Sequence, residues 1–419
     1  MIRAAVINAV YPPEPVVSAQ MGRDLAGHLA QIGVGVTVLC PYPSRPFGAD
    51  YAQFQSSDDA RLHCEAPVEV VRLPSFSAPQ SRLLPRMRES LSFGRHVCNH
   101  LERHLPGLNA VYVNSWPLFS QALIARYCAR RRIPLILHIK DIYPESLLEK
   151  LPRFSRGMAN LPLMALDRWI AWRAARVVVI SENMRRTYIE SRGLAVEKIV
   201  TILDWVDETR FEHLPARGEV CVRYGVPQEP FTFLYLGNIG PVAGVEKLIE
   251  GFHAADLKHA QLLIVGDGSA RAACVARAKA LGAATVRFIS DPEVRNVPLL
   301  QSLGHVCLLP LRKGAGLSSI PSKLMAYLLS AKPVLATLDA GSDTARCIRE
   351  ARCGWVEEPE NVGRLAEKMR EVASLPQVEL ESIGQRGRSY GLVHYSRAAG
   401  LHRLGNVIMD ACGVNGSPV

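Results

Sequence analysis

Short apolar runs alternate with longer amphipathic stretches along this chain of 419 residues. In the first half, runs typical of buried strands cover residues 2–11, 36–42, 68–74, 110–115, 134–140 and 176–182. A helical pattern over residues 21–33 lies between the first two runs, after a loop over residues 12–20. Each later run is followed by a helical or loop stretch. Alternation of this kind predicts a parallel, doubly wound α/β sheet.

The same pattern starts again after a Pro- and Gly-rich stretch at residues 214–230. Strand-like runs then cover residues 231–237, 261–268, 286–290, 306–311 and 333–337, with helical patterns at 244–255, 270–282 and 322–331. Because the chain is too long for one ordinary core, we expect two Rossmann-like domains in tandem. Such sheets bind ligands beyond the carboxyl ends of their strands, which predicts a ligand in a cleft between two facing domains.

Positive charge is concentrated in the first half of the chain. Residues 1–200 contain 25 Lys and Arg against 16 Asp and Glu, whereas residues 201–419 contain 24 against 23. A basic half suits an anionic ligand or an anionic membrane surface. Nucleic acid is not an expected partner, because aromatic residues make up only 7% of the chain and no nucleic-acid-binding motif is present.

One basic segment, residues 81–97, mixes four arginines with apolar residues: Arg82, Arg86, Arg88 and Arg95 stand among Leu83, Leu84, Met87, Leu91 and Phe93. Two interpretations fit this composition. The segment is either a helix lying on an anionic membrane or a helix packed on its own domain with its arginines in water.

Neither a membrane span nor a metal site is expected. No apolar run approaches the roughly 18 residues that a spanning helix needs, and the first residues do not resemble a cleavable signal. The ten cysteines are scattered without a C-x-x-C pair, so we expect reduced cysteines and no metal or other cofactor. We therefore expect a cytoplasmic protein, with peripheral attachment to the inner face of the cytoplasmic membrane as an option.

Candidate chemistry gathers where predicted strands end. Gly237, Gly240 and Gly244 follow one strand and either allow close backbone approach to a ligand or form a tight turn. Asp267, beside Gly266 after another strand, can cap the next helix or contact a ribose. His138, close to Asp141, ends a strongly apolar strand and is either a structural histidine or part of a site.

Residues 315–337 join a Gly- and Ser-rich run to a helix predicted to open on Pro321, Ser322 and Lys323. Proline is tolerated at the first helical position because the N–H that it lacks would be unpaired there, and Ser319 is placed to cap the helix. Free N–H groups, the helix dipole and Lys323 would then point at one place. The segment therefore predicts a diphosphate site, with a solvated Lys323 as the alternative.

Three segments carry a resemblance to a known family: VISENMRRTYIESRGLAVEKIVTILDWVDETRF (179–211), YLGNIGPVAGVEKLIEGF (235–252) and SIPSKLMAYLLSAKPVLAT (319–337). The chain resembles the retaining, nucleotide-sugar-dependent glycosyltransferases of family 4, which have GT-B architecture. The likeness covers nearly the whole chain and is closest to the bacterial polysaccharide branch, which includes colanic-acid-type and O-antigen fucosyl or N-acetylfucosaminyl transferases. It implies an acceptor-binding domain over residues 1–205, a donor-binding domain over 206–385, and a C-terminal helix over 386–419 that crosses back.

The resemblance also implies roles for particular residues. His138, Asp141 and Lys323 are the candidate catalytic residues. The candidate donor-binding residues lie in the diphosphate loop, the segment at the base and the helix start: Gly237, Asn238, Gly240, Gly266, Asp267, Phe288, Ile289, Ser290, Ser318, Ser319, Pro321, Ser322 and Lys323. Four positions depart from the family pattern. Ser318 and Ala326 replace two frequent glutamates, and Asn238 and Ala243 replace two frequent cations.

The resemblance implies transfer of a sugar, most simply from a uridine diphosphate carrier, by a front-face mechanism without a metal. Lys323 and backbone N–H groups would stabilise the departing diphosphate. The expected acceptor is a polyprenyl-diphosphate-linked sugar or another saccharide of a surface polysaccharide such as O-antigen. Two alternatives remain: a nucleotide-sugar epimerase, and a weakly active or inactive protein that binds nucleotide sugar as a partner.

Overall fold

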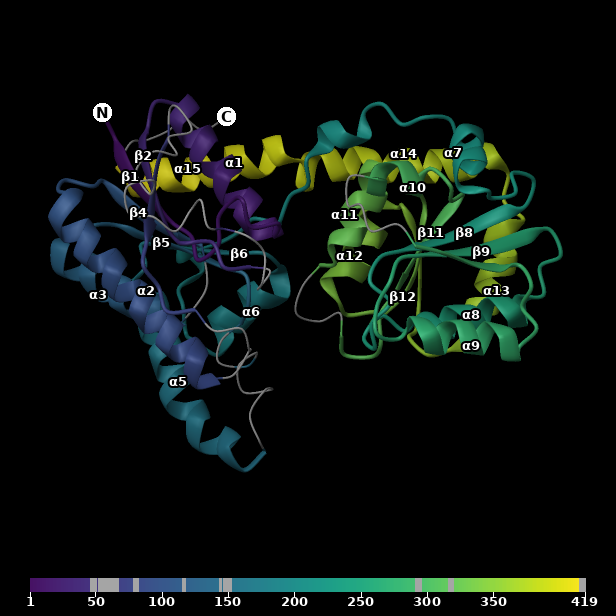
Figure 1. Cartoon of the computed structure of the whole chain (residues 1–419), viewed down its shortest axis with the longest axis horizontal. Helices are drawn as coiled ribbons and strands as arrows, with labels where there is room; N and C mark the ends of the chain where they lie inside the picture. The colour runs from purple at the N-terminus through teal and green to yellow at the C-terminus, as the bar shows by residue number, and fades with distance from the viewer. Residues whose placement is uncertain are drawn as a thin grey trace. The chain divides into compact units, whose positions relative to one another are not determined.

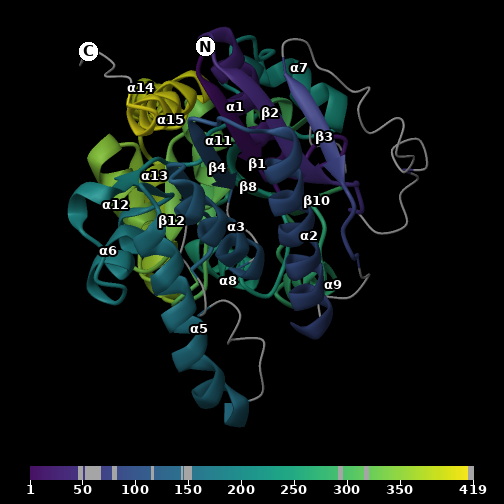
Figure 2. The same cartoon turned by 90° about the vertical axis from the view of Figure 1, so that its left-hand side faces the viewer.

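The computed structural model describes residues 1–45, 51, 68–77, 83–114, 118–142, 145, 153–290, 296–315 and 320–413. The chain divides into two compact units. The first comprises Met1–Leu203 together with Gly400–Val419, and the second comprises Asp204–Ala399. Each unit contains one parallel β-sheet with helices packed on it (Figures 1 and 2). The predicted α/β fold with two doubly wound domains is confirmed.

The first unit has a seven-stranded sheet in the order β3-β2-β1-β4-β5-β6-β7. Its strands are β1 (Arg3–Ile7), β2 (Gly35–Pro41), β3 (Glu69–Leu73), β4 (Ala110–Asn114), β5 (Leu135–Ile139), β6 (Arg176–Val179) and β7 (Ile199–Thr201). Its helices are α1 (Val17–Gln31), α2 (Leu83–His104), α3 (Leu118–Arg131), α5 (Arg153–Arg173), α6 (Glu182–Glu190) and most of α15 (Arg397–Ala411). The strand order reverses between β1 and β4, which is where ligands bind in such sheets.

Burial on both faces explains why these strands are apolar throughout. All five residues of β5 are buried, as expected for a parallel sheet that helices cover on both sides. Leu135, Leu137 and Ile139 pack in one core with residues of α2, α3 and α5. Because side chains alternate along a strand, His138 lies on the opposite face of the sheet.

The second unit repeats the plan with a six-stranded sheet in the order β10-β9-β8-β11-β12-β13. Its strands are β8 (Phe231–Leu236), β9 (Ala260–Val265), β10 (Val286–Ile289), β11 (Val306–Pro310), β12 (Val334–Thr337) and β13 (Gly354–Glu357). Its helices are α7 (Arg217–Tyr224), α8 (Val245–Ala255), α9 (Arg271–Ala280), α10 (Val297–Gln301), α11 (Ser322–Leu329), α12 (Asp343–Ala351), α13 (Val362–Ala373) and α14 (Gln377–His394). Here the order reverses between β8 and β11.

Two helix boundaries differ from the prediction. Helix α1 begins at Val17 rather than at residue 21, because Ala19 already belongs to the buried side of the helix. Helix α11 begins at Ser322, one residue after the predicted start. Pro321 is extended, with ψ of 134°, and its carbonyl accepts the Leu324 N–H at 3.0 Å. Pro321 is therefore the N-cap residue and not the first helical residue.

Helix α2 packs on the first unit with much of its apolar side. Phe93 is buried in the core, and the exposed Arg88 places its guanidinium 4.3 Å from the centre of the Phe76 ring. Arg86 forms an ion pair with Glu89 in the same helix. Arg82 and the side chains of Leu83 and Leu84 lie outside the described residues. Within the described ranges, no helix is long and apolar enough to cross a membrane.

Candidate active site

Two glycine-containing loops pack backbone against backbone at the carboxyl edge of β8 and β9. Gly266 has φ of +139°, and a Cβ there would lie 2.1 Å from the Gly237 carbonyl oxygen. Gly268 has φ of +152°, and its Cβ would lie 2.4 Å from the Ile239 carbonyl oxygen. The Ile239 N–H also donates to the Asp267 carbonyl at 2.8 Å. Side chains are therefore excluded at both glycines, and the predicted residues Gly237, Gly266 and Asp267 do lie together.

Lys323 reaches this edge from the first turn of α11. A Cβ on Gly237, which has φ of +145°, would lie 2.1 Å from Lys323 Cε, so the lysine stem needs a bare backbone there. Its Nζ donates a hydrogen bond to the Tyr235 hydroxyl at 2.7 Å and lies 4.4 Å from the centre of that ring. Burial lowers the pKa of Lys323 to about 8. Lys323 is therefore partly buried and hydrogen-bonded, which differs from the alternative of a solvated helix lysine.

The start of α11 adds hydrogen-bond donors beside this lysine. Among the residues that the structure describes, no side chain caps the helix, and its first turn has no acidic residue. The N–H groups of a helix start and its dipole favour an anion. Ser318 and Ser319 fall outside the described residues, so the predicted contributions of these two serines, including the cap by Ser319, stay predictions.

The other donor-binding candidates follow the edge strand of the same sheet. Phe288 and Ile289 end β10, and Ser290 comes directly after it. The Ile289 carbonyl accepts the N–H of Gly266 at 3.0 Å, which joins this strand end to the glycine loops. Asp267 does not cap α9. Its carboxylate accepts the N–H of the adjacent Gly268 at 2.7 Å, and α9 begins only at Arg271.

Two of the departures from the family pattern occupy apolar surroundings. Ala243 is buried in the main core of the second unit. Ala326 packs with Phe211 and Leu329 in a small apolar cluster. An alanine fits both places without the cost of burying a charge. Asn238, the third departure, contributes its backbone carbonyl, which accepts a hydrogen bond from the Tyr235 hydroxyl at 2.6 Å.

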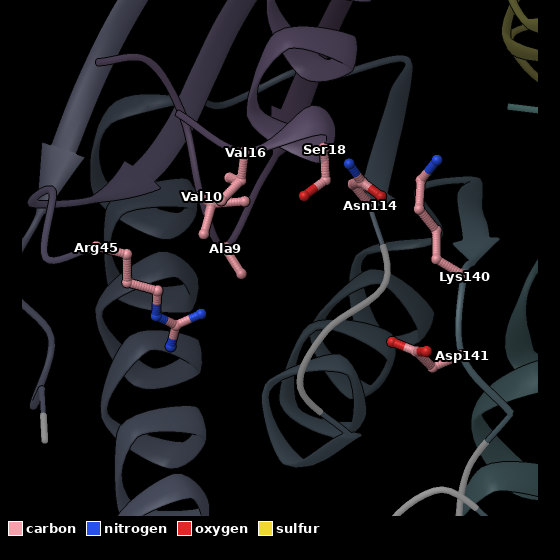
Figure 3. Close-up of a pocket in the computed structure, with 8 residues that line it drawn as sticks. All are labelled: Ala9, Val10, Val16, Ser18, Arg45, Asn114, Lys140 and Asp141. Carbon is pink, nitrogen blue, oxygen red and sulfur yellow. The ribbon is translucent and has the colours of Figure 1, made fainter. Parts of the chain in front are cut away.

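A pocket of about 210 Å³ lies in the first unit, near the point where its strand order reverses. Figure 3 shows Arg45 on one side of the pocket and Lys140 with Asp141 on the other. Asn114 and Ser18 lie between them, and the remaining lining residues are Ala9, Val10 and Val16. The predicted Asp141 therefore lines a pocket that carries charges of both signs.

Backbone contacts fix the loop that carries Arg45. The Glu14 carboxylate accepts the N–H groups of Ser44 and Arg45, both at 3.0 Å. The Arg45 guanidinium pairs with Glu89 of α2 at 2.9 Å. Burial raises the pKa of Glu14, and the two N–H donors partly offset this effect. Glu14 thus ties the loop after β1 to the loop after β2.

His138 is buried in β5, two residues before Lys140, which lines this pocket. Only 1% of the residue is exposed. Its Nδ1 lies 2.7 Å from the Tyr112 hydroxyl, and its Nε2 is buried without a hydrogen-bond partner within the described part of the chain. Burial, helped by the nearby charge of Lys140, lowers the pKa of His138 well below 6.5. His138 is therefore neutral at pH 7.

Three neighbouring strands carry buried polar atoms without partners in the described residues. They are Nδ2 and Oδ1 of Asn8 after β1, Oδ1 of Asn114 in β4 and Nε2 of His138 in β5. Asn114 is paired with His138 in the strand register. Asn8 lies against α1, where a Cβ on Gly22 would come within 1.6 Å of its Nδ2. Unpaired buried polar groups of this kind cost stability.

An ion-pair network around the buried Arg192 holds the side chain of Glu145. Arg192 is fully buried and donates from Nε to Asp167 at 2.9 Å. Its two terminal nitrogens donate to both carboxylate oxygens of Glu145, at 2.8 and 2.6 Å. The Tyr188 hydroxyl also donates to Asp167, at 3.2 Å. Glu145 is therefore fixed at its side chain by a bidentate contact.

Sequence reasoning missed several residues that the structure places at the carboxyl edge of β8 and β9 and in the pocket of the first unit. Tyr235 stands inside an apolar strand pattern and looks like a core residue. Arg45 and Asn114 come from separate parts of the chain, and only the position of Asn114 at a strand end could have indicated it. Within the described ranges, no three His, Cys, Asp or Glu side chains lie close enough together to bind a metal ion.

Comparison with known proteins agrees with this geometry. The sequence model "Glycosyl transferase 4-like domain" matches residues 18–205, and "Glycosyl transferases group 1" matches residues 230–374. "Probable glycosyltransferase WbjE" of Pseudomonas aeruginosa is 24% identical over 301 residues, which are 72% of each chain. "Putative colanic acid biosynthesis glycosyl transferase WcaI" of Escherichia coli K12 is 27% identical over 390 residues, which are 90% of this chain and 93% of the relative.

A solved structure, the HepE protein of Anabaena in complex with UDP, matches 98% of this chain and all of that one. The TM-score is 0.70 at 15% sequence identity, so this likeness concerns the fold. The two matched sequence models together span most of the chain, one in each structural unit. The chain therefore belongs to the glycosyltransferases of family 4 with GT-B architecture.

Proposed function

We propose that the chain transfers a sugar from a nucleotide-sugar donor to a growing bacterial surface polysaccharide, with retention of the anomeric configuration. The single observation that carries the donor part is Lys323, a largely buried lysine beside bare glycine backbone at the β8 edge. Among the described residues, no carboxylate pairs with Lys323, and a largely buried ammonium in such surroundings suits a diphosphate. The name of WcaI, which refers to colanic acid biosynthesis, supports a polysaccharide product. The UDP bound to HepE supports a uridine diphosphate carrier.

Transfer breaks the bond between the anomeric carbon and the diphosphate oxygen and forms a bond from that carbon to an acceptor hydroxyl. Negative charge grows on the departing diphosphate, and Lys323 with the first N–H groups of α11 would stabilise it. The acceptor proton would pass to the departing oxygen, on the same face of the sugar. Phe288, Ile289 and Ser290 would meet the nucleotide base through their backbone.

The pocket of the first unit is the proposed acceptor site. Asn114, Ser18 and Asp141 offer hydrogen-bond partners to sugar hydroxyls, and the cations Arg45 and Lys140 suit a phosphate group. This mixture fits a sugar linked to a polyprenyl diphosphate better than a neutral saccharide alone. His138 is within hydrogen-bond distance of Tyr112 and neutral, so it would contact the substrate through a hydrogen bond and not as a positive charge.

Peripheral attachment to an anionic membrane would bring the enzyme to such an acceptor. The basic first half of the chain and the exposed Arg88 and Arg95 of α2 support it. Because Phe93 is buried in the core, the proposed contact is made by the exposed side of α2, which carries Arg88 and Arg95.

The first test is thermal unfolding of the whole chain with UDP, GDP, ADP, CMP and their sugar conjugates. A ligand at about 100 times its Kd adds roughly 2.7 kcal/mol to the stability of the folded state. We expect UDP and one UDP-sugar to raise the midpoint, and Lys323→Ala to abolish that rise. Lys258→Ala is the matched control, because Lys258 is exposed and, within the described part of the chain, pairs with Asp256 at the surface.

Nucleotide release from the same sugar conjugates then tests the activity itself. Slow release of UDP without acceptor, and faster release with polyprenyl-diphosphate-linked N-acetylglucosamine in detergent, would support transfer. Product sugar formed from donor alone would indicate an epimerase. Binding without any release would indicate a non-catalytic nucleotide-sugar partner, and neither binding nor release would refute the proposal.

A further inference from the structure

Tyr235 joins two parts of the proposed donor site through one hydroxyl group. The residue stands next to the end of β8, and none of its surface is exposed. Its hydroxyl accepts a hydrogen bond from Lys323 Nζ at 2.7 Å and donates one to the Asn238 carbonyl at 2.6 Å. A hydroxyl has a single proton to donate. Because Lys323 can only donate and the Asn238 carbonyl can only accept, the Tyr235 proton points to Asn238 and its lone pair to Lys323.

The surroundings of Lys323 leave this hydroxyl as its main polar anchor. Among the described residues, no carboxylate lies within ion-pair distance of Nζ, and burial alone lowers the lysine pKa. The lysine stem passes over Gly237, where even a Cβ would collide with Cε. The ammonium also lies over the face of the Tyr235 ring, which attracts a cation. The ring of Tyr235 thus sets the position of the Lys323 ammonium, and its hydroxyl sets the direction of one ammonium N–H.

We propose that Tyr235 is a positioning residue for the donor diphosphate, because its hydroxyl holds the Lys323 ammonium and the Asn238 backbone in one preformed arrangement. The inference rests on the proposed role of Lys323 in binding diphosphate. A free lysine has many rotamers, and fixing them before the ligand arrives removes that cost from binding. The same hydroxyl sets the Asn238 carbonyl, and with it the loop from Gly237 to Gly240.

Phenylalanine at this position would keep the ring but lose both contacts. The Asn238 carbonyl would lose its described side-chain donor, and Lys323 would lose its acceptor. The ring face would still attract the ammonium. Tyr235→Phe would therefore leave the Lys323 ammonium near the ring but remove the hydrogen bond that orients it. Loss of preorganisation, rather than loss of the cation, is therefore what this variant measures.

The test uses the full chain, with inorganic pyrophosphate and UDP as probes in isothermal titration calorimetry at about pH 7. Tyr235→Phe should raise the Kd for pyrophosphate roughly tenfold, the scale of one hydrogen bond to a charged group. Tyr327→Phe is the matched control. Tyr327 is equally buried and its hydroxyl contacts the backbone of Leu236 and Leu308, but neither Lys323 nor Asn238. The control should bind pyrophosphate as the wild type does.

A double-mutant cycle separates positioning from a general effect on the fold. Lys323→Ala should weaken pyrophosphate binding at least as much as Tyr235→Phe. Adding Tyr235→Phe to Lys323→Ala should change the Kd by a smaller factor than it does in the wild type, because only the effect through the Asn238 carbonyl then remains. Equal fold-changes from Tyr235→Phe in both backgrounds would overturn the inference, because Tyr235 would then act independently of the lysine. A comparable loss in Tyr327→Phe would also overturn it.

Two further outcomes separate the inference from the proposed function. Wild-type affinity in Tyr235→Phe together with weak binding in Lys323→Ala would overturn the positioning role and leave the diphosphate site standing. Wild-type affinity in Lys323→Ala would refute the diphosphate site itself, and the role of Tyr235 would fail with it.

Discussion

Lys323 should destabilise the second unit at neutral pH, and its replacement by methionine should stabilise the protein. Burial lowers the pKa of Lys323 from its usual 10.5 to about 8 in the folded state. Between about pH 8 and pH 10.5 the unfolded chain therefore binds more protons than the folded chain, and wild-type stability rises with pH. Below about pH 8 both states are protonated and the full cost is present. Above about pH 10.5 both are neutral and the cost has disappeared.

The interval between the two pKa values sets the size of the effect. At 1.36 kcal/mol for each unit of pKa difference, the buried charge of Lys323 lowers the free energy of unfolding by at most about 3 kcal/mol. Lys323 keeps part of its side chain in contact with solvent, which screens the charge and reduces the cost. We therefore expect Lys323→Met to raise the free energy of unfolding by about 1–3 kcal/mol at pH 7. Methionine keeps an unbranched stem over Gly237 and the Tyr235 ring, so packing changes little.

Urea unfolding of wild type, Lys323→Met and Lys258→Met at a series of pH values from 7 to about 10 measures this difference. The advantage of Lys323→Met over wild type should shrink as pH rises through the window, while Lys258→Met should match wild type throughout. The reasoning would be refuted if Lys323→Met were less stable than wild type at pH 7. A stabilisation independent of pH would refute it as well, because the gain would then come from packing and not from the buried charge.

Three further predictions concern the first unit. Asn8→Leu removes two buried atoms that have no partner among the described residues, with little change of shape, and should stabilise the protein by about 1–3 kcal/mol in urea unfolding; a lower stability would show that partners exist. His138→Ala should lower kcat in nucleotide-release assays while the Kd for UDP stays nearly unchanged, and loss of UDP binding would contradict this. Sedimentation with anionic liposomes should exceed that with neutral ones and fall when the exposed Arg88 and Arg95 are both replaced by glutamine; indifference to lipid charge would exclude electrostatic attachment.

The strands could be predicted from sequence because both faces of each sheet are covered. Burial on both sides turns a strand into an uninterrupted apolar run, and the runs found by pattern correspond to β1 to β6 and β8 to β12. Strand β7 (Ile199–Thr201) has only three residues and merges with its flanking apolar positions. Strand β13 is half-buried and contains Glu357, so its pattern gives no comparable signal.

The site could be predicted only where one local segment carries the signal. Lys323 was found because glycine, serine and proline stand directly before it. Tyr235 was missed because a tyrosine within an apolar strand predicts a core residue, and its partner lies 88 residues away. Arg45 was missed for a similar reason, since its contacts with Glu14 and Glu89 join three distant segments. A local sequence pattern does not predict contacts between residues that lie far apart in the sequence.

Features that cost stability gather at the two places where ligands are expected. Where β1, β4 and β5 end, Asn8, Asn114 and His138 have buried polar atoms without a partner among the described residues, and Lys323 buries a charge where β8 ends. Each of these strand ends borders or flanks the reversal of strand order in its own sheet. A buried polar atom without a partner, or a buried charge, costs stability at each of these positions, so packing alone does not explain the residues that are present. Partners that arrive with the substrates would remove the cost in both sheets, which is why we assign binding to these edges and not to other surfaces of the units.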